Sequence, residues 1–402
     1  DEAIVTPYVG TDAPIRAPGH EGSNALDPSS HLNQISSSLE DIPLEALAEE
    51  VSNLRELSAL ETIHFERVSA ERLVERVHED VQRSYPPETQ GYMLAVFSLL
   101  GFFDIPHPDW ADLMASLELA ERVAWVNESG DLIEVLDTAS TTDPFTRLEL
   151  VKEISDALAR QHFPTARPPS QLHEDSSRAR EGIRQGNKSV VAFRYARQRN
   201  ISPAVRPPDE LFKGFPPQNG IPPMLDSWHW LPWETGPFFV EARIGATSAL
   251  SRIDELFIRP PTKTLELFRP SLYDEENQKD ALISPDFAES ILSSPPVFSG
   301  HFGIGGLIPW MMGSLPVNQA KSIAGPILSD RYALWELPRE GKILLLETRW
   351  PDEVSARRFF ENLPSSPFVR VTSSSKAPFY VKVICAETEI GSQLLIDALG
   401  RK

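Results

Sequence analysis

Apolar residues recur every three or four positions along much of the chain, which is the spacing of one face of an α-helix. The series Leu44, Leu47, Val51, Leu54 and Leu57 predicts such a helix between residues 44 and 60. A second helix is expected over residues 70–85, because Ser69 can cap its start and Pro86-Pro87 stops it. Further helices are predicted through residues 92–103, 110–119, 144–163, 176–198 and 354–363.

Shorter apolar runs bounded by turn residues predict β-strands. Two of them, 122–127 and 131–136, flank the turn Glu128-Ser129-Gly130 and are expected to pair. Others are expected at residues 62–68, 343–348 and 379–385. Together these elements place the chain in the α+β class, with a mainly helical core, a small sheet and a C-terminal α+β extension.

Polar and proline-rich segments divide the chain into three parts. Residues 1–45 are rich in Pro, Gly, Ser, Asp and Asn, a composition that cannot bury enough apolar surface to fold alone. We interpret them as an extended N-terminal arm laid on a partner, with a disordered leader as the alternative. A polar linker within residues 274–300 then separates a core of residues 46–274 from a C-terminal extension of residues 275–402.

Composition narrows the function classes. The 402 residues are 41% hydrophobic, enough for a sizeable core, and the net charge of −20 argues against a nucleic acid or an anionic membrane as partner. The single cysteine, Cys385, excludes an internal disulfide and a cysteine-based zinc site. No apolar run reaches the roughly 18 residues that a transmembrane helix needs. The first residue is Asp1, which favours an exported mature chain in the periplasm or envelope.

The most informative stretch is the predicted helix that contains residues 151–163. Lys152, Glu153 and Asp156 stand at the spacing at which a zinc peptidase helix carries His, Glu and His. In such a helix the two imidazoles share a face and hold the metal, while the glutamate activates the metal-bound water. Here the glutamate is present and both imidazoles are missing.

Several segments, taken in order, resemble the bacterial zinc-metallopeptidase-like proteins of the HExxH, zincin-type class. The helix matches the pattern HElxHALqDQhF at Ala157, Leu158, Gln161, His162 and Phe163. The other matching segments are the strand pair 123–136, the turn Gln185-Gly186-Asn187-Lys188, the aromatic segment 231–240, the PPxSTEQ-type stretch 260–273, and Asp330-Arg331-Tyr332 with Trp350 and residues 356–360. Each motif alone is weak, but their order and spacing over roughly residues 50–365 are specific.

The departures from the family pattern fall on its metal ligands. By this resemblance Lys152 and Asp156 replace the two histidines and Gln185 replaces a glutamate ligand, whereas Glu153 remains as a relic of the general base. Asn187 and Arg269 replace an Asp and a His that would border the cleft. Zinc requires neutral or anionic donors, so we expect no metal and no cofactor. We expect a salt-bridge cluster instead, in which Lys152 pairs with Asp156 and Glu153 with a Lys or Arg such as Arg269.

Other candidate chemistry is weaker. A relocated metal site at His162, His173 and their acidic neighbours lacks converging geometry, and we interpret His162 as structural. His229 lies among tryptophans and is expected to line the core or a groove. The glycines at 303–306 have no phosphate-loop context, Cys385 is expected to be buried, and residues 307–312 are expected to belong to the core, with an exposed binding loop as the alternative.

The sequence therefore predicts a catalytically inactive, metallopeptidase-like protein. We expect it to be a scaffold or binding subunit of an exported or envelope-associated assembly, with protein partners on the N-terminal arm and the C-terminal extension. The vacated cleft and the strands at 122–136 could hold a peptide by strand addition. The alternatives are a peptidase or other hydrolase with a non-standard site that uses Glu153, and an inhibitor or regulator of an active relative.

Overall fold

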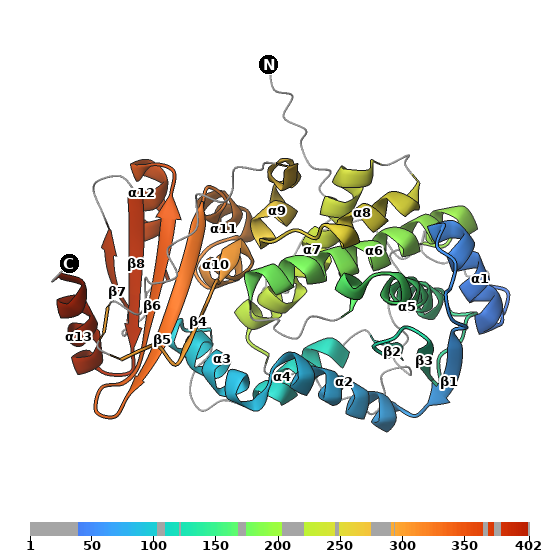
Figure 1. Cartoon of the computed structure of the whole chain (residues 1–402), viewed down its shortest axis with the longest axis horizontal. Helices are drawn as coiled ribbons and strands as arrows, with labels where there is room; N and C mark the ends of the chain where they lie inside the picture. Colours follow the sequence, from blue (N-terminus) through green and yellow to red (C-terminus); the bar gives the residue numbers. More distant parts are fainter. Residues whose placement is uncertain are drawn as a thin grey trace, which may run out of the picture. The chain divides into compact units, whose positions relative to one another are not determined.

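In the computed structural model, helices and two β-sheets make up the described part of the chain (Figure 1), which confirms the α+β class. The structure describes residues 39–102, 109–119, 122–167, 174–202, 221–245, 249–274, 291–292, 294–364, 369–373 and 379–400. They belong to one compact unit, Leu39–Lys402. Among the described residues, no helix has the length and apolar character needed to cross a membrane.

The N-terminal two thirds of the unit are mainly helical. The helices are α1 (Leu44–Arg55), α2 (Ala70–Ser84), α3 (Pro87–Leu99), α4 (Trp110–Leu119), α5 (Pro144–His162), α6 (Asp175–Arg199), α7 (Pro223–Ile244), α8 (Ile253–Ile258) and α9 (Thr264–Phe268). Ser69 accepts a hydrogen bond from the Arg72 amide, so the predicted cap of α2 is confirmed. Pro223 opens α7, and the aromatic segment 231–240 lies within this helix.

A three-stranded sheet lies beside α5. It contains β1 (His64–Val68), β2 (Ala124–Val126) and β3 (Leu132–Leu136) in the order β1-β3-β2. The predicted pair of β2 and β3 is confirmed as antiparallel, with Trp125 opposite Glu134. The other edge of β3 is paired with β1 in parallel, so β3 has no free edge.

The described residues of the C-terminal part form a five-stranded antiparallel sheet and four helices. In chain order the elements are β4 (Phe298–Gly300), α10 (Gly303–Met312), α11 (Val317–Ala324), β5 (Ser329–Leu337), β6 (Gly341–Trp350), α12 (Glu353–Glu361), β7 (Val369–Ser373), β8 (Phe379–Ala386) and α13 (Glu389–Gly400). The strand order is β4-β5-β6-β8-β7. Residues 307–312 are part of the buried helix α10, which confirms the core interpretation of this run.

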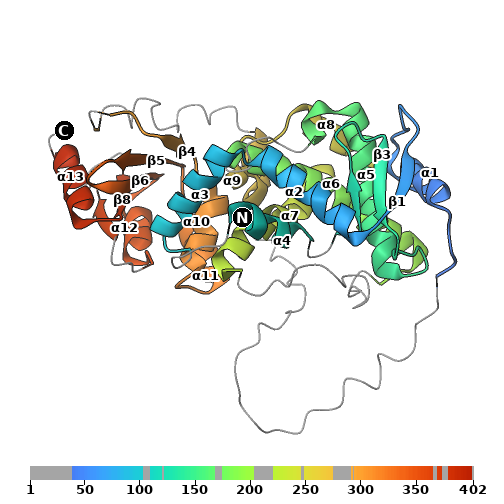
Figure 2. The same cartoon turned by 90° about the horizontal axis from the view of Figure 1, so that it is seen from below.

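The two faces of this sheet belong to different hydrophobic clusters. Ile343 and Leu345 of β6 pack with Leu395 of α13, whereas Leu344 and Leu346 point into the main core. Cys385 is fully buried on the main-core side, as expected. The views in Figures 1 and 2 place α13 on the outer side of the sheet and α10 between the sheet and the helical part.

The main core continues across the predicted boundary at residues 274 and 275. It contains Trp110 and Trp228 from the helical part together with Trp310 and Trp350 from the C-terminal part. At the other predicted boundary, residues 1–38 of the arm lie outside the described part of the chain, and Leu39 and Ile42 pack against the core around α5. The division into 1–45, 46–274 and 275–402 stays a prediction.

Candidate functional site

Helix α5 carries the motif positions through the centre of the helical part. It begins where Asp143 accepts a hydrogen bond from the Thr146 amide at 2.7 Å and Pro144 occupies the first turn. Glu153 and Asp156 are buried on it, and Lys152 is four-fifths covered. The predicted central helix is therefore confirmed, and its polar side chains must find partners inside the protein.

Helices α6 and α7 approach each other through glycines. A Cβ atom on Gly236 would lie 2.0 Å from the Gly182 carbonyl oxygen, and one on Gly186 would lie 2.6 Å from that of Gly236. The two helices run in the same direction, because Arg178 lies against Trp228 and Arg194 donates to the Gly245 carbonyl. Because α7 packs against the glycine face of α6, the face of α6 that carries Lys188 is turned towards α5.

Glu153 is held by a lysine of α6. The ammonium of Lys188 lies 2.7 Å from Glu153 Oε1, and the two side chains are 1% and 6% exposed. The expected partner Arg269 is exposed instead and does not contact Glu153. The prediction of a cationic partner is confirmed, and its proposed identity was wrong because Arg269 follows α9 at the surface.

The expected pair of Lys152 and Asp156 is not formed. Lys152 donates to Glu149, one turn earlier on α5, at 2.5 Å. Asp156 Oδ2 instead accepts from Arg160 at 2.6 Å and from Arg184 at 2.8 Å. Asp156 is fully buried, and the planar guanidinium groups of Arg160 and Arg184 are better suited to a buried carboxylate than the strongly hydrated ammonium of Lys152.

Arg160 links this pair to the small sheet. Its Nη1 donates to the carbonyl oxygens of Val126 at 2.8 Å and Asn127 at 2.9 Å. Val126 is the last residue of β2, and every residue of that strand is buried. The outer edge of β2 is thus occupied by Arg160 at this carbonyl, so addition of a peptide strand at 122–136 would require displacement of buried side chains.

The remaining motif positions lie on α6 and also have partners. Gln185 Nε2 donates to Glu181 at 2.5 Å, while Arg184 forms two hydrogen bonds to the same carboxylate. Asn187 accepts from Arg55 Nε at 2.9 Å and donates to Ser155. Asp156 and Asn187 thus contact the opposite helix where α5 crosses α6, whereas Lys152 and Gln185 are bonded to neighbours on their own helices.

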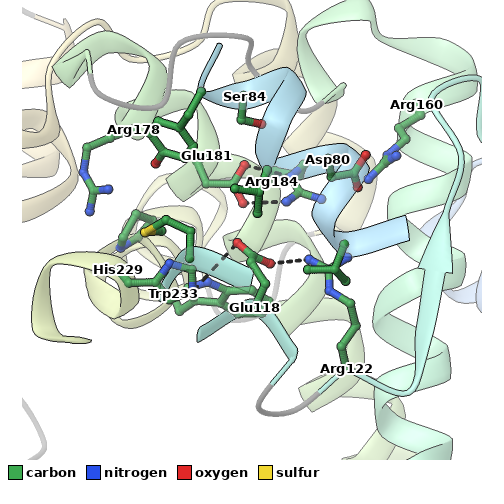
Figure 3. Close-up of a pocket in the computed structure, with 15 residues that line it drawn as sticks. Asp80, Ser84, Glu118, Arg122, Arg160, Arg178, Glu181, Arg184, His229 and Trp233 are labelled. Carbon is green, nitrogen blue, oxygen red and sulfur yellow. Dashed lines mark hydrogen bonds and ion pairs between the residues drawn. The ribbon is translucent and has the colours of Figure 1, made fainter. Parts of the chain in front are cut away.

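Charged residues from two further helices and one loop extend the cluster. Glu118 of α4 pairs with Arg122, and the His229 ring of α7 lies 3.8 Å from Glu118. Figure 3 shows these residues below Arg184 and Glu181, around a cavity with a volume of about 50 Å³. His229 lines this cavity, in agreement with its expected place in the core or a groove. His162, which we expected to be structural, lies 2.6 Å from the Ser58 carbonyl oxygen.

The pKa shifts follow from this geometry. Burial alone would raise the pKa of Asp156, but Arg160 and Arg184 outweigh it and lower the pKa to about 2. Burial also opposes ionisation of Glu118, but the neighbouring Arg122 outweighs it and lowers the pKa of Glu118 to about 2. Burial lowers the pKa of His229, so its ring is neutral at pH 7. The carboxylates are thus stabilised as anions by fixed cations.

This donor set does not fit zinc. A zinc site needs several neutral or anionic donors that converge on one point, yet Asp156 is already bonded to two guanidiniums and Gln185 offers only an amide. Within the described residues, no group of three or more His, Cys, Asp or Glu side chains is arranged to hold a metal ion. The arrangement can neutralise buried charge, but it supplies no metal-bound water.

The sequence did not identify the cations that complete the cluster, namely Arg160, Arg184 and Lys188, or the acids Glu118 and Glu181. One signal was available: Asp156 and Arg160 are four apart on one helix, the spacing of a helical ion pair. The other pairs join residues that are far apart in the chain. No protein-family model, curated protein or solved structure matches this chain.

Proposed function

We propose that the chain is a catalytically inactive relative of zincin-type metallopeptidases and serves as a scaffold or binding subunit. The observation that carries this proposal is the state of Asp156, which bridges Arg160 and Arg184 at the position of a metal-binding histidine in the resemblance. Two guanidinium groups bring positive charge to the place where a zinc ion would need to bind. A dication there would be repelled at close range.

The state of Glu153 supports the same proposal. A general base in such an enzyme acts on water that a metal has made acidic. Glu153 instead accepts from the buried ammonium of Lys188, which lies over the ring of Trp233 at 5.2 Å. The carboxylate is therefore used to balance a lysine charge within the protein.

We also propose that α5 and α6 are arranged as the corresponding helices of a zincin-type protein are. In a zincin-like arrangement, the helix with the two histidine positions, here α5, crosses the helix with the third ligand position, here α6. The ligand positions of the two helices then face each other. Asp156 contacts Arg184, and Ser155 contacts Asn187, which is the proximity that such a crossing requires. We propose that ion pairs now join the two helices where a metal would join them in an active relative.

We propose that protein partners bind through the N-terminal arm and the C-terminal extension, in an assembly outside the cytoplasm. This placement rests on the resemblance and on the composition of residues 1–45, and co-purification of the native protein with its neighbours tests it. Recovery of an active metallopeptidase as the main partner would favour the role of regulator.

Metal analysis of the purified full chain combined with a peptidase assay tests the loss of catalysis. We expect less than one zinc per ten chains and no hydrolysis above the buffer rate, whether or not zinc is added. The matched pair of variants is Glu153→Gln and Glu149→Gln, since both residues lie on α5 beside the same small cavity. Stoichiometric zinc, or activity that only Glu153→Gln abolishes, would overturn the proposal and favour the hydrolase.

A further inference from the structure

Arg178 differs from the other arginines that line the cavity in lacking a carboxylate partner. It lies on α6 and is 3% exposed. Its guanidinium stacks over the Trp228 ring at 3.9 Å, and its Nη2 donates to the carbonyl of the same residue. Among the described residues it forms no ion pair, whereas Arg184 contacts two carboxylates.

The nearby acids are already neutralised by other cations. Glu181 is bonded to Arg184, and Glu118 is bonded to Arg122. The third acid of the cavity wall, Asp80, pairs with Arg83 and accepts from the Trp125 indole. A further carboxylate, Asp175, lies one turn earlier on α6 and acts on Arg178, but burial raises the pKa of Asp175 to about 7 and Thr264 is bonded to it. Among the described residues Arg178 thus has no directly bonded carboxylate, which is an unfavourable state for a buried cation.

Several unused hydrogen-bonding groups meet the same cavity. Arg178 Nε and His229 Nε2 are buried and form no hydrogen bond within the described part of the chain. Ser84 and Tyr85, at the end of α2, also line this cavity, and each carries a hydroxyl group. Figure 3 shows Arg178 and His229 on one side of the cavity, away from Arg122 and Arg160. Buried polar groups of this kind ordinarily have a partner.

We propose that this part of the cavity binds a small monovalent anion, a halide or a short carboxylate. The anion would take its charge balance from Arg178 and hydrogen bonds from the hydroxyls of Ser84 and Tyr85. The cavity volume of about 50 Å³ selects against large anions. The apolar side chains of Val81 and Met114, which line the same cavity, would exclude much of the competing water.

Thermal unfolding of the full chain in different sodium salts at one ionic strength tests the proposal. Chloride, bromide and acetate are compared with gluconate, which is too large for the cavity. We expect the unfolding temperature to rise with chloride or acetate and then saturate, because a ligand of the native state stabilises it. Comparison of the chloride and bromide salts with the acetate salt shows whether the cavity prefers a halide or a carboxylate. Equal unfolding temperatures in all four salts would overturn the proposal.

Two variants locate the binding site. Arg178→Met removes the charge, so we expect it to abolish the difference between chloride and gluconate and to raise the unfolding temperature in gluconate. Tyr85→Phe keeps the ring that packs on Trp110 and removes only the hydroxyl, so the half-saturating chloride concentration should rise at least threefold. Tyr195→Phe, whose hydroxyl binds Glu50 outside this cavity, is the control and should leave that concentration unchanged.

The outcomes of these variants decide the proposal. Retention of the full salt difference in Arg178→Met would overturn it. If Arg178→Met does not fold, Tyr85→Phe decides, and an unchanged half-saturating concentration in that variant would overturn it. The site does not depend on the loss of zinc at Asp156, so metal analysis and anion titration can fail separately.

Discussion

Lys188 of α6 and Glu153 of α5 form an ion pair at 2.7 Å in which both side chains are almost completely buried. Removal of one partner leaves the other charge buried without compensation. Replacement of both by apolar residues avoids this loss, because the desolvation of the pair is then no longer needed. Removal of one partner is therefore expected to cost far more stability than replacement of both partners together.

The first prediction concerns this pair. Lys188→Met should lower the free energy of unfolding by about 3–5 kcal/mol, because it leaves the Glu153 carboxylate unpaired. The double variant Lys188→Met with Glu153→Leu should recover most of that loss. Urea unfolding monitored by tryptophan fluorescence measures both.

The exposed pair of Arg357 and Glu353 provides the control for this prediction. Its side chains are 63% and 50% exposed, so Arg357→Met should change the free energy of unfolding by less than about 1 kcal/mol. A loss below that size for Lys188→Met as well would contradict the structure of the cluster.

The second prediction concerns acid denaturation. Asp156 has a pKa of about 2 in the folded protein and an ordinary value of 3.8. Stability from this group is therefore present above pH 3.8 and is lost as the pH falls towards 2, with a total of about 2 kcal/mol. Asp156→Asn should flatten the dependence of the unfolding free energy on pH in this range. A curve parallel to that of the wild type would show that the carboxylate is not paired as described.

The third prediction concerns Asp175, whose contribution to stability changes with pH in the opposite direction to that of Asp156. Burial, together with the charge of Asp330, raises the pKa of Asp175 to about 7. Its protonated form is favoured by folding, so this contribution is present below pH 3.8 and is lost as the pH rises towards 7. Asp175 accepts from the Thr264 amide at 3.2 Å, and Asp330 accepts from the Phe302 and Gly303 amides. Asp175→Asn should reduce the fall in stability between pH 4 and 7.

Asp330→Asn provides the comparison for this third prediction. It removes the neighbouring negative charge and should lower the pKa of Asp175, which a carboxyl-selective NMR titration can follow. His301, whose ring contacts the Asp330 backbone, and Glu174 also face this pair and should be titrated in the same experiment. An unchanged titration of Asp175 would contradict the coupling.

The fourth prediction concerns the crossing of α6 and α7. Gly236→Ala would place a Cβ atom 2.0 Å from the Gly182 carbonyl oxygen, which cannot move without separating the two helices. We expect a loss of more than about 3 kcal/mol or failure to fold, in line with the overpacking of a rigid contact. Gly91→Ala in α3 meets no atom within 4 Å and should instead stabilise the protein by about 0.5–1 kcal/mol. Equal effects of the two substitutions would contradict this close contact.

Local elements could be predicted from the sequence, because short-range signals determine them. Ser69, Pro144 and the turn before Asp131 fixed helix starts and a strand pair that the structure confirms. The contents of the cleft could not be predicted in the same way. Whether Asp156 pairs with Lys152 or with Arg184 depends on how α5 crosses α6, and the glycine contacts of α6 with α7 help to fix that crossing.

The lack of an ion pair at Arg178 among the described residues also could not be predicted from the sequence. Any arginine in a helix with nearby acids is expected to find one of them, and α6 contains Glu181 within one turn. Only the three-dimensional arrangement shows that Arg184 uses both oxygens of Glu181. The competition between two arginines for one carboxylate is decided by their side-chain directions.

The hydrophobic core that joins Trp228 to Trp310 and Trp350 makes the helical part depend on the C-terminal part. A chain shortened after residue 274 would expose to water the apolar surface of the helical part that Trp310 and Trp350 share, so we expect the helical part not to fold stably without the C-terminal sheet. The inward face of that sheet already has its occupant within the same chain. The outer side of the sheet carries α13, where Ile390 is exposed.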